Sequence, residues 1–444
     1  MFSINPLIIK GLINFYISSR FITQEMWSSP ELQKNILQKI ITRFEGHQIP
    51  TTPYLFSNYH AAQSLLYAYT SLFDESQAEK LAQSAVEALE QFMEANAEVT
   101  NAKIALAGKY LGAAWLLQHL VNIEILDPED ADMLSDLDEM IQAALLENSQ
   151  EKNYDTLYGL VSIGIYYLER LPHDESARTP LEQIVASLDQ MAIKENGLVY
   201  WRDYFTMGED EQHKTRYNLG LAHGIPGIIS FLGKAYQHEI LPEVSQPLLI
   251  QSAEWLCQQE LKNHPGCFPH SIILEEDNDD LPGRLAWCYG DLCVVVALMH
   301  VAKGLKQDKW KQKAIEIALQ TTQRLTPQEA GVNFNPKDNL VDIGICHGGG
   351  GIAHMYRKLY QATGNERFQQ AADHWLQVLI TQYQQDEVGG HYKRMRVNPD
   401  TKAQYWEEDY SFLEGYAGIA MVILGFLNDQ HDTDWERALL LDIA

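Results

Sequence analysis

Two kinds of hydrophobic segment alternate along the chain. In the first kind, apolar residues recur at three- and four-residue steps and polar residues fill the opposite face, which predicts helices that lie on the surface. These segments are residues 75–95, 130–146, 181–193, 247–261, 310–325 and 366–383. In the second kind nearly every residue is apolar, which predicts helices buried on all sides. The alternation predicts an all-α protein of paired outer and inner helices.

The buried segments begin at glycines that recur at nearly regular distances. These glycines are Gly108, Gly159, Gly224, Gly290, Gly348 and Gly415, so the steps after the first are 65, 66, 58 and 67 residues, and the first is 51. A seventh buried segment is expected near Asn58, where the glycines are absent. Such a period is typical of a repeat array. We therefore expect an α/α toroid of about seven inner and seven outer helices, with an open solenoid as the alternative.

Short extended segments are expected to connect the helices of this array. Residues 197–205 and 389–397 have the alternating, β-branched and aromatic composition of strands. No stretch has the composition of a linker, so we expect residues 1–444 to form one domain, with residues 1–50 as a candidate N-terminal extension. The small residues at the helix starts allow sharp turns and close packing. All these turns would face one end of the ring, where a functional site is expected to gather.

Charge and composition limit the classes of function. The 444 residues carry a net charge of −27, which disfavours binding to nucleic acid or to anionic lipid. No run approaches the ~20 apolar residues of a transmembrane helix. At the N-terminus Lys10 lies inside the apolar stretch rather than before it, whereas a signal peptide has its charge first. Five cysteines are too few and odd in number for a disulfide framework, so we expect a cytoplasmic protein with reduced thiols.

Three residues at equivalent turns of neighbouring repeats form a candidate metal site. Cys288 ends the fifth turn, and Cys346 and His347 end the sixth. Zinc accepts two cysteines and one histidine, and three protein ligands leave the fourth tetrahedral position open, as in catalytic sites. The alternatives are buried structural cysteines and a helix-start histidine bonded to a carbonyl group.

Four motifs in this order along the chain resemble those of the lanthionine synthetase C-like family. They are Leu-Ala-His-Gly-Ile-Pro-Gly-Ile at 221–228, Trp-Cys-Tyr-Gly-Asp at 287–291, Cys-His-Gly-Gly-Gly-Gly-Ile at 346–352 and Phe-Leu-Glu-Gly-Tyr-Ala-Gly-Ile at 412–419. The resemblance extends over about residues 50–430 and implies an α/α toroid of seven inner and seven outer helices. Two departures affect turns: Leu292 and Cys293 stand where the family commonly has Pro-Gly, and Ser162 replaces a glycine.

The resemblance also implies a cofactor and roles for particular residues. The cofactor is Zn²⁺, and its ligands are Cys288, Cys346 and His347. The catalytic residues that it implies are His223 for proton transfer, Asp155 as an active-site aspartate, and Arg284 and Tyr289 on either side of the first zinc cysteine. From the chemistry we expect Asp155 to orient His223 and Arg284 to stabilise an enolate.

The activity that this resemblance implies is that of a stand-alone lanthipeptide cyclase. Such an enzyme adds peptide cysteine thiols to dehydroalanine or dehydrobutyrine and forms lanthionine thioether rings. The expected partners are a dehydrated precursor peptide, a separate dehydratase and an export transporter, and such a complex would hold the protein at the inner face of the membrane. The alternatives are addition of glutathione or another free thiol, and a non-catalytic peptide-binding toroid. A glycoside-processing toroid would need paired carboxylates, and Asp155 alone does not supply them.

Overall fold

The computed structural model describes most of the chain. The described residues are 29–45, 52, 54–99, 102–205, 214–264, 266–276, 283–337, 339–384, 392–398, 400–428 and 434–444. The expectation about a signal peptide and residues 389–391 of one expected connection lie outside them. Among the helices in these ranges, none is long and apolar enough to cross a membrane.

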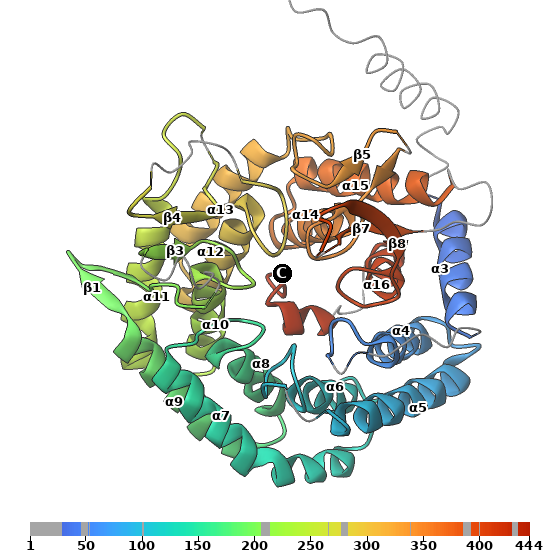
Figure 1. Ribbon diagram of the computed structural model, residues 1–444, viewed down its shortest axis with the longest axis horizontal. Helices are drawn as coiled ribbons and strands as arrows, with labels where there is room; N and C mark the ends of the chain where they lie inside the picture. The colour runs from blue at the N-terminus through green and yellow to red at the C-terminus, as the bar shows by residue number, and fades with distance from the viewer. Residues whose placement is uncertain are drawn as a thin grey trace, which may run out of the picture.

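The buried segments of the sequence form an inner ring of helices (Figure 1). In the described ranges these are α4 (Tyr59–Phe73), α6 (Leu111–Asn122), α8 (Leu160–Arg170), α10 (Ile225–Gln237), α12 (Asp291–Leu305), α14 (Gly349–Thr363) and α16 (Tyr416–Leu427). In α12 every residue from Asp291 to Ala302 is buried, as a segment without a polar face requires. The seventh inner helix predicted near Asn58 is α4, and the Asn58 side chain caps it by accepting a hydrogen bond from the Ala61 amide.

The amphipathic segments form the outer ring. In the described ranges its helices are α3 (Pro30–Phe44), α5 (Ala78–Ala97), α7 (Asp138–Glu151), α9 (Arg178–Met191), α11 (Pro242–Cys257), α13 (Asp308–Thr321) and α15 (Glu366–Gln384). The segment predicted as one α-helix at 130–146 consists of two elements: the 3₁₀ helix η1 (Pro128–Leu137) comes first, and α7 follows it. Another short 3₁₀ helix, η2 (Glu175–Ala177), leads into α9. Residues 30–44, which lie in the candidate N-terminal extension, form α3.

The ring is closed. The last inner helix, α16, packs against both α3 and α4, so the two ends of the helical array meet (Figure 1). An open solenoid would leave α4 and α16 apart. The predicted α/α toroid of seven inner and seven outer helices is therefore confirmed for the described part of the chain.

Short antiparallel strand pairs connect helices; of the predicted extended segments, residues 198–200 of 197–205 and residues 393–397 of 389–397 are strands. The pairs are β1 (Ile193–Glu195) with β2 (Leu198–Tyr200), β3 (Arg216–Asn218) with β4 (Ser271–Ile273), β5 (Phe334–Asn335) with β6 (Leu340–Val341), and β7 (Lys393–Val397) with β8 (Gln404–Glu408). The strand pairs are short, and the hydrophobic core is formed by the helices of the two rings.

Glycine is required at the turns because backbone segments meet there without room for a side chain. Gly290 has φ +114°, and a Cβ added to it would lie 1.7 Å from the Arg284 carbonyl oxygen. A Cβ on Gly220 would lie 2.5 Å from the Cys288 carbonyl oxygen. The fourth and fifth turns therefore approach one another closely, and this approach helps to build the site described below.

The centre of the ring holds a segment that sequence reasoning did not place. Residues 434–444, which we call the central segment, include 3₁₀ helix η4 (Asp434–Leu439) and lie inside the inner ring (Figure 1). The indole of Trp287 donates to the Leu439 carbonyl (2.8 Å), and His300 Nε2 lies 2.9 Å from the Leu440 carbonyl oxygen. Trp435 is buried.

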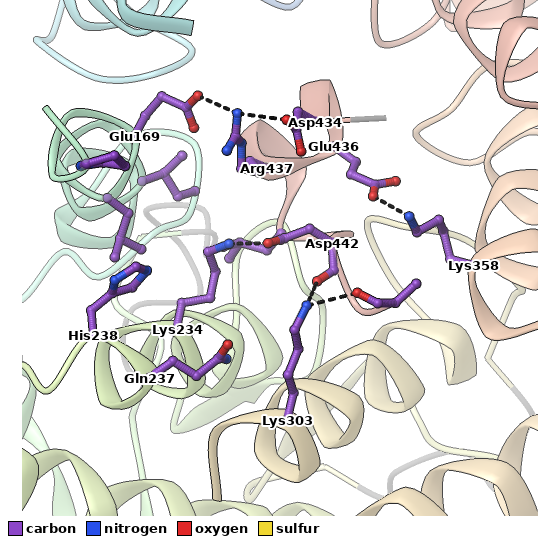
Figure 2. Close-up of a pocket in the computed structure, with 15 residues that line it drawn as sticks. Glu169, Lys234, Gln237, His238, Lys303, Lys358, Asp434, Glu436, Arg437 and Asp442 are labelled. Atoms are coloured by element: carbon purple, nitrogen blue, oxygen red, sulfur yellow. Dashed lines mark hydrogen bonds and ion pairs between the residues drawn. The ribbon is translucent and has the colours of Figure 1, made fainter. Parts of the chain in front are cut away.

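Ion pairs connect the central segment to the inner helices far from their glycine turns. Lys358 Nζ lies 2.6 Å from Glu436 Oε1, Arg437 pairs with Glu169 at 3.1 Å, and Lys234 pairs with Asp442 (Figure 2). A cavity of about 340 Å³ lies among these charged side chains. The inner-helix partners of these pairs, Glu169, Lys234 and Lys358, all lie in the later turns of their helices, so the ion pairs hold the central segment away from the glycine turns, whereas the Trp287 bond ties it to the fifth turn.

The carboxylate of Glu436 provides a test of this attachment. It is buried and lies 2.7 Å from His354 Nε2 and 2.6 Å from Lys358 Nζ. Glu436→Gln leaves a buried cation without its partner, so we expect the free energy of unfolding to fall by about 3–5 kcal/mol. Urea unfolding would measure it. The control is Glu175→Gln, which removes an exposed pair with Arg178 and should cost no more than about 1 kcal/mol. Equal losses in the two variants would contradict the structural role of Glu436.

Candidate active site and metal centre

The two cysteines and the histidine predicted as metal ligands lie together. One ligand atom from each of Cys288, Cys346 and His347 lies within 4.8 Å of the others. Cys288 comes just before α12, and Cys346 and His347 come just before α14. The backbone holds the two turns together, because the amides of Trp287 (3.1 Å) and Cys288 (3.2 Å) both donate to the Cys346 carbonyl. Residues 58 positions apart in the chain thus form one cluster.

The donor set fits a zinc ion. Both cysteines are free thiols, and their sulfurs interact with each other. Hydrogen bonding from Cys346 lowers the pKa of the Cys288 thiol well below its usual range, whereas that contact and burial raise the pKa of Cys346. The two sulfurs and a nitrogen of His347 lie close enough to bind one ion. Two thiolates and one imidazole are ligands that zinc prefers.

Two carboxylates flank the imidazole of His347. Asp342 Oδ2 lies 3.4 Å from Nε2, and Glu414 Oε1 lies 3.6 Å from Nδ1. Burial alone would lower the pKa of His347, but its hydrogen bonds to Asp342 and Cys288 raise that pKa to about 11. Burial raises the pKa of Glu414 to about 8, although His347 opposes this effect. The candidate metal centre is thus enclosed by acidic groups as well as by sulfur.

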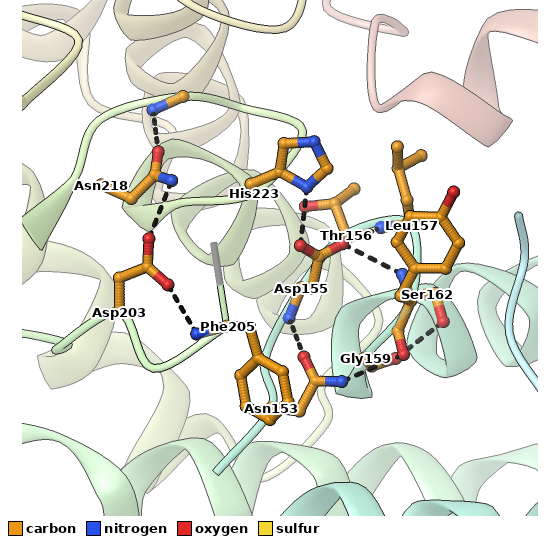
Figure 3. Close-up of polar contacts among 12 residues, drawn as sticks. Asn153, Asp155, Thr156, Leu157, Gly159, Ser162, Asp203, Phe205, Asn218 and His223 are labelled. Carbon is orange, nitrogen blue, oxygen red and sulfur yellow. Dashed lines mark hydrogen bonds and ion pairs between the residues drawn. The ribbon is translucent and has the colours of Figure 1, made fainter. Parts of the chain in front are cut away.

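His223 and Asp155 form a hydrogen-bonded pair, as predicted. His223 Nδ1 lies 2.6 Å from Asp155 Oδ2, and the other oxygen of this carboxylate accepts the amides of Leu157 (2.8 Å) and Tyr158 (3.0 Å) (Figure 3). Burial lowers the pKa of His223, but the bond to Asp155 outweighs it and the net pKa is raised. His223 is therefore held in one orientation, with Nε2 directed away from Asp155.

Tyr289 connects this pair with the metal ligands. It follows Cys288 directly, and its ring centroid lies 6.1 Å from that of His223. The Asn218 amide donates to the Tyr289 hydroxyl at 3.3 Å and to Asp203 at 3.1 Å (Figure 3 shows the Asn218–Asp203 bond). The Tyr289 hydroxyl is thus held by hydrogen bonds that also involve Asn218 and Asp203, and burial raises the pKa of this phenol.

Arg284, predicted to stabilise an enolate, lies at the same end of the ring. Its charge is among the influences that lower the pKa of Cys288. Its backbone amide donates to His270 Nε2 at 3.2 Å, and its carbonyl accepts the Asp291 amide at 3.2 Å. The structure thus brings all seven predicted site residues to the turn end of the ring.

Four other polar residues of the site were not among the seven predicted site residues. Asp342, Glu414, Asn218 and His270 all contact predicted site residues. Asn218 and Asp342 each stand six residues before a helix-start glycine, so the repeat itself marks their positions. Glu414 stands in the seventh turn at the place that His223 and His347 occupy in the fourth and sixth. Comparison of the turns, residue by residue, marks these three positions but not what their side chains contact.

Comparison with known proteins agrees with this architecture. The family model of the lanthionine synthetase C-like proteins matches residues 52–440, and the chain belongs to this family. Among solved structures, nisin cyclase superimposes with a TM-score of 0.70 at 19% sequence identity, covering 94% of this chain and 98% of that one. That likeness extends over the whole toroid and concerns the fold.

Two further solved structures match more weakly. An α-mannanase of Bacteroides thetaiotaomicron has a TM-score of 0.47 at 9% identity, covering 90% of this chain and 95% of its own. An unsaturated glucuronyl hydrolase of Streptococcus agalactiae has a TM-score of 0.45 at 12% identity, covering 91% and 94%.

Proposed function

We propose that this protein is a zinc-dependent cyclase that forms lanthionine thioethers in a dehydrated peptide. One observation carries the proposal: a Cys₂His cluster and a His–Asp pair lie at the same end of the ring, linked by Tyr289. Membership of the lanthionine synthetase C-like family and the likeness to nisin cyclase support it.

Cys288, Cys346 and His347 would hold the zinc ion. When bound, zinc supplies a position at which the thiol of a peptide cysteine loses its proton and becomes a nucleophile. The two protein thiolates already balance the charge of the ion, so the substrate sulfur would remain electron-rich. The chain contributes the preformed cluster, which the backbone bonds to the Cys346 carbonyl hold together.

His223 would supply the proton that completes the addition. The peptide sulfur bonds to the β-carbon of a dehydroalanine or dehydrobutyrine, and the electron pair of the double bond gives an enolate. The α-carbon of this enolate then takes a proton, which His223 donates while Asp155 fixes its orientation. The thiol proton lost at the start balances the proton gained, so the peptide mass is unchanged.

Arg284 and Tyr289 complete the proposed site. The guanidinium of Arg284 would stabilise negative charge on the enolate oxygen, since its field already reaches Cys288. Tyr289, fixed by Asn218, would orient the peptide between His223 and the cysteines. Both are positions at the turns, as expected for a site built on a rigid ring.

The proposed chemistry also implies partners and a compartment. The alkene must be made by a dehydratase acting on serine or threonine, and a transporter would export the product. We place the protein in the cytoplasm, where free thiols persist. A complex with the dehydratase and the transporter would lie at the inner face of the membrane. The substrate is the dehydrated precursor peptide of a lanthipeptide.

The test uses a synthetic peptide that contains one cysteine and one dehydroalanine, with glutathione at equal concentration. Ring closure is intramolecular, and a short flexible connection gives the cysteine an effective concentration on the order of millimolar. We expect the peptide to lose its free thiol with no change in mass, as measured by thiol alkylation and mass spectrometry. A variant peptide with serine in place of cysteine is the control and should stay unmodified.

The same spectrum examines the alternatives. A dominant product heavier by one glutathione, with the peptide thiol still open to alkylation, would replace the cyclase by an enzyme that adds free thiols. Binding without any product would indicate a peptide-binding toroid. Either result would overturn the proposed function.

A further inference from the structure

One turn structure recurs in four repeats of the ring. An Asn or Asp stands six residues before the helix-start glycine, and its Oδ1 accepts the backbone amide two residues further on. The four residues and their N···Oδ1 distances are Asn153 (3.2 Å), Asn218 (2.9 Å), Asp342 (3.3 Å) and Asp409 (2.7 Å). Asparagine and aspartate both build this turn, because only one oxygen is needed for it. The turn therefore does not explain why aspartate stands at position 342.

The four residues differ in the other terminal atom of the side chain, which is Nδ2 in asparagine and Oδ2 in aspartate. In Asn153 and Asn218 it is a nitrogen that donates, to Asn148 (2.8 Å) and to Asp203 (3.1 Å) respectively. In Asp409 it is an oxygen that pairs with Arg394 at 2.8 Å.

In Asp342 the second oxygen faces a candidate zinc ligand. Its Oδ2 lies 3.4 Å from His347 Nε2 and also accepts the Asn333 amide at 3.3 Å. The Asp342 side chain is fully buried. A buried carboxylate fixed by the turn on one oxygen and by Asn333 on the other cannot turn away from the imidazole. Asp342 is thus in a fixed position relative to His347.

We propose that Asp342 is a positioning residue for the metal centre: it holds the proton of His347 on Nε2 and leaves the lone pair on Nδ1 for the ion. This inference rests on the zinc site of the proposed function. A metal-bound histidine commonly donates its other ring N–H to a carboxylate, which sets the tautomer and the orientation of the ring. The repeat supplies this carboxylate at the turn that carries the metal ligand.

Asp342→Asn separates the two roles of the side chain. Asn153 and Asn218 show that asparagine builds the same turn in this ring. Its single oxygen is then engaged by the Gly344 amide, so its NH₂ group would face Nε2 of His347. The NH₂ group of the substituted residue and the Nε2–H of His347 are both hydrogen-bond donors, so the Nε2–H tautomer of His347 loses its acceptor. We expect zinc affinity to fall about 10–100-fold, the usual effect of removing such a partner.

Competition with a chromophoric zinc chelator measures this affinity in the full-length protein. Asp409→Asn is the matched control, because it makes the same change at the same turn position but removes a contact to Arg394 and none to His347. Its zinc affinity should equal that of the wild type. Thermal unfolding of the zinc-free proteins reports whether the turn at 342 is retained.

A second measurement does not depend on the variant. In the zinc-loaded wild type, ¹⁵N NMR of His347 should show a protonated Nε2 and a metal-bound Nδ1. Ligation through Nε2, or equal affinity of the wild type and Asp342→Asn, overturns this inference and leaves the proposed function intact. Absence of zinc binding in the wild type overturns both.

Discussion

Cys346→Ala should remove zinc from the protein and abolish thioether formation. The purified wild type is expected to contain one zinc per chain, held by Cys288, Cys346 and His347. Loss of a direct ligand should weaken binding by more than the roughly 10–100-fold typical of changes outside the ligand shell. Metal analysis and the cyclisation assay measure the two effects. The toroid should remain folded, because its core is made by the apolar faces of the helices.

Cys257→Ala is the control for this experiment. It makes the same substitution on the outer helix α11, outside the site, and should retain zinc and activity. Full zinc occupancy in a variant that lacks both Cys288 and Cys346 would refute the assignment of the ligands.

His223→Asn should leave zinc binding unchanged and slow cyclisation by about 10²–10⁴-fold, the usual contribution of general acid catalysis. The pair with Asp155 raises the pKa of His223, so the acid form persists to higher pH than in a free histidine. In the wild type the rate should fall as the pH rises through this pKa. Because Asp155→Asn lowers the pKa, the fall should begin at lower pH. Rate–pH profiles of the zinc-loaded enzymes measure both effects.

The control for the acid is His238→Asn. His238 follows the last turn of α10, the helix whose first turn follows His223, and lies in the cavity lining at the other end of the ring. Its substitution should not change the rate. A wild-type rate and product pattern in His223→Asn would mean that another group delivers the proton.

The architecture was predictable because its determinants are local. Apolar composition, helical period and glycine spacing each indicate inner and outer helices without knowledge of distant contacts. The closure of the ring was left open, since it depends on the packing of α16 against α3 and α4. The central segment was missed for a related reason. It contains only a short 3₁₀ helix, its contacts are mainly with residues far away in the chain, and no periodicity marks it.

The metal centre was predictable as far as its residue types are distinctive. Two cysteines and a histidine at equivalent turns stand out in a chain with five cysteines. Asn218 and Asp342 do not, because asparagine and aspartate are ordinary turn residues. Their second role depends on the direction of one side-chain atom toward a neighbouring turn, and this direction is a property of the folded ring.

Closure of the ring has a consequence for how the protein is made. A ribosome releases α3 and α4 long before α16, so the face of α4 that α16 covers stays exposed to water until α16 is made. Pairings between residues so far apart in the chain form slowly, and apolar surface that waits for its partner favours aggregation. Production of the protein at low temperature or with chaperones should therefore increase the yield of closed rings, since the nascent chain must be protected until its last inner helix arrives.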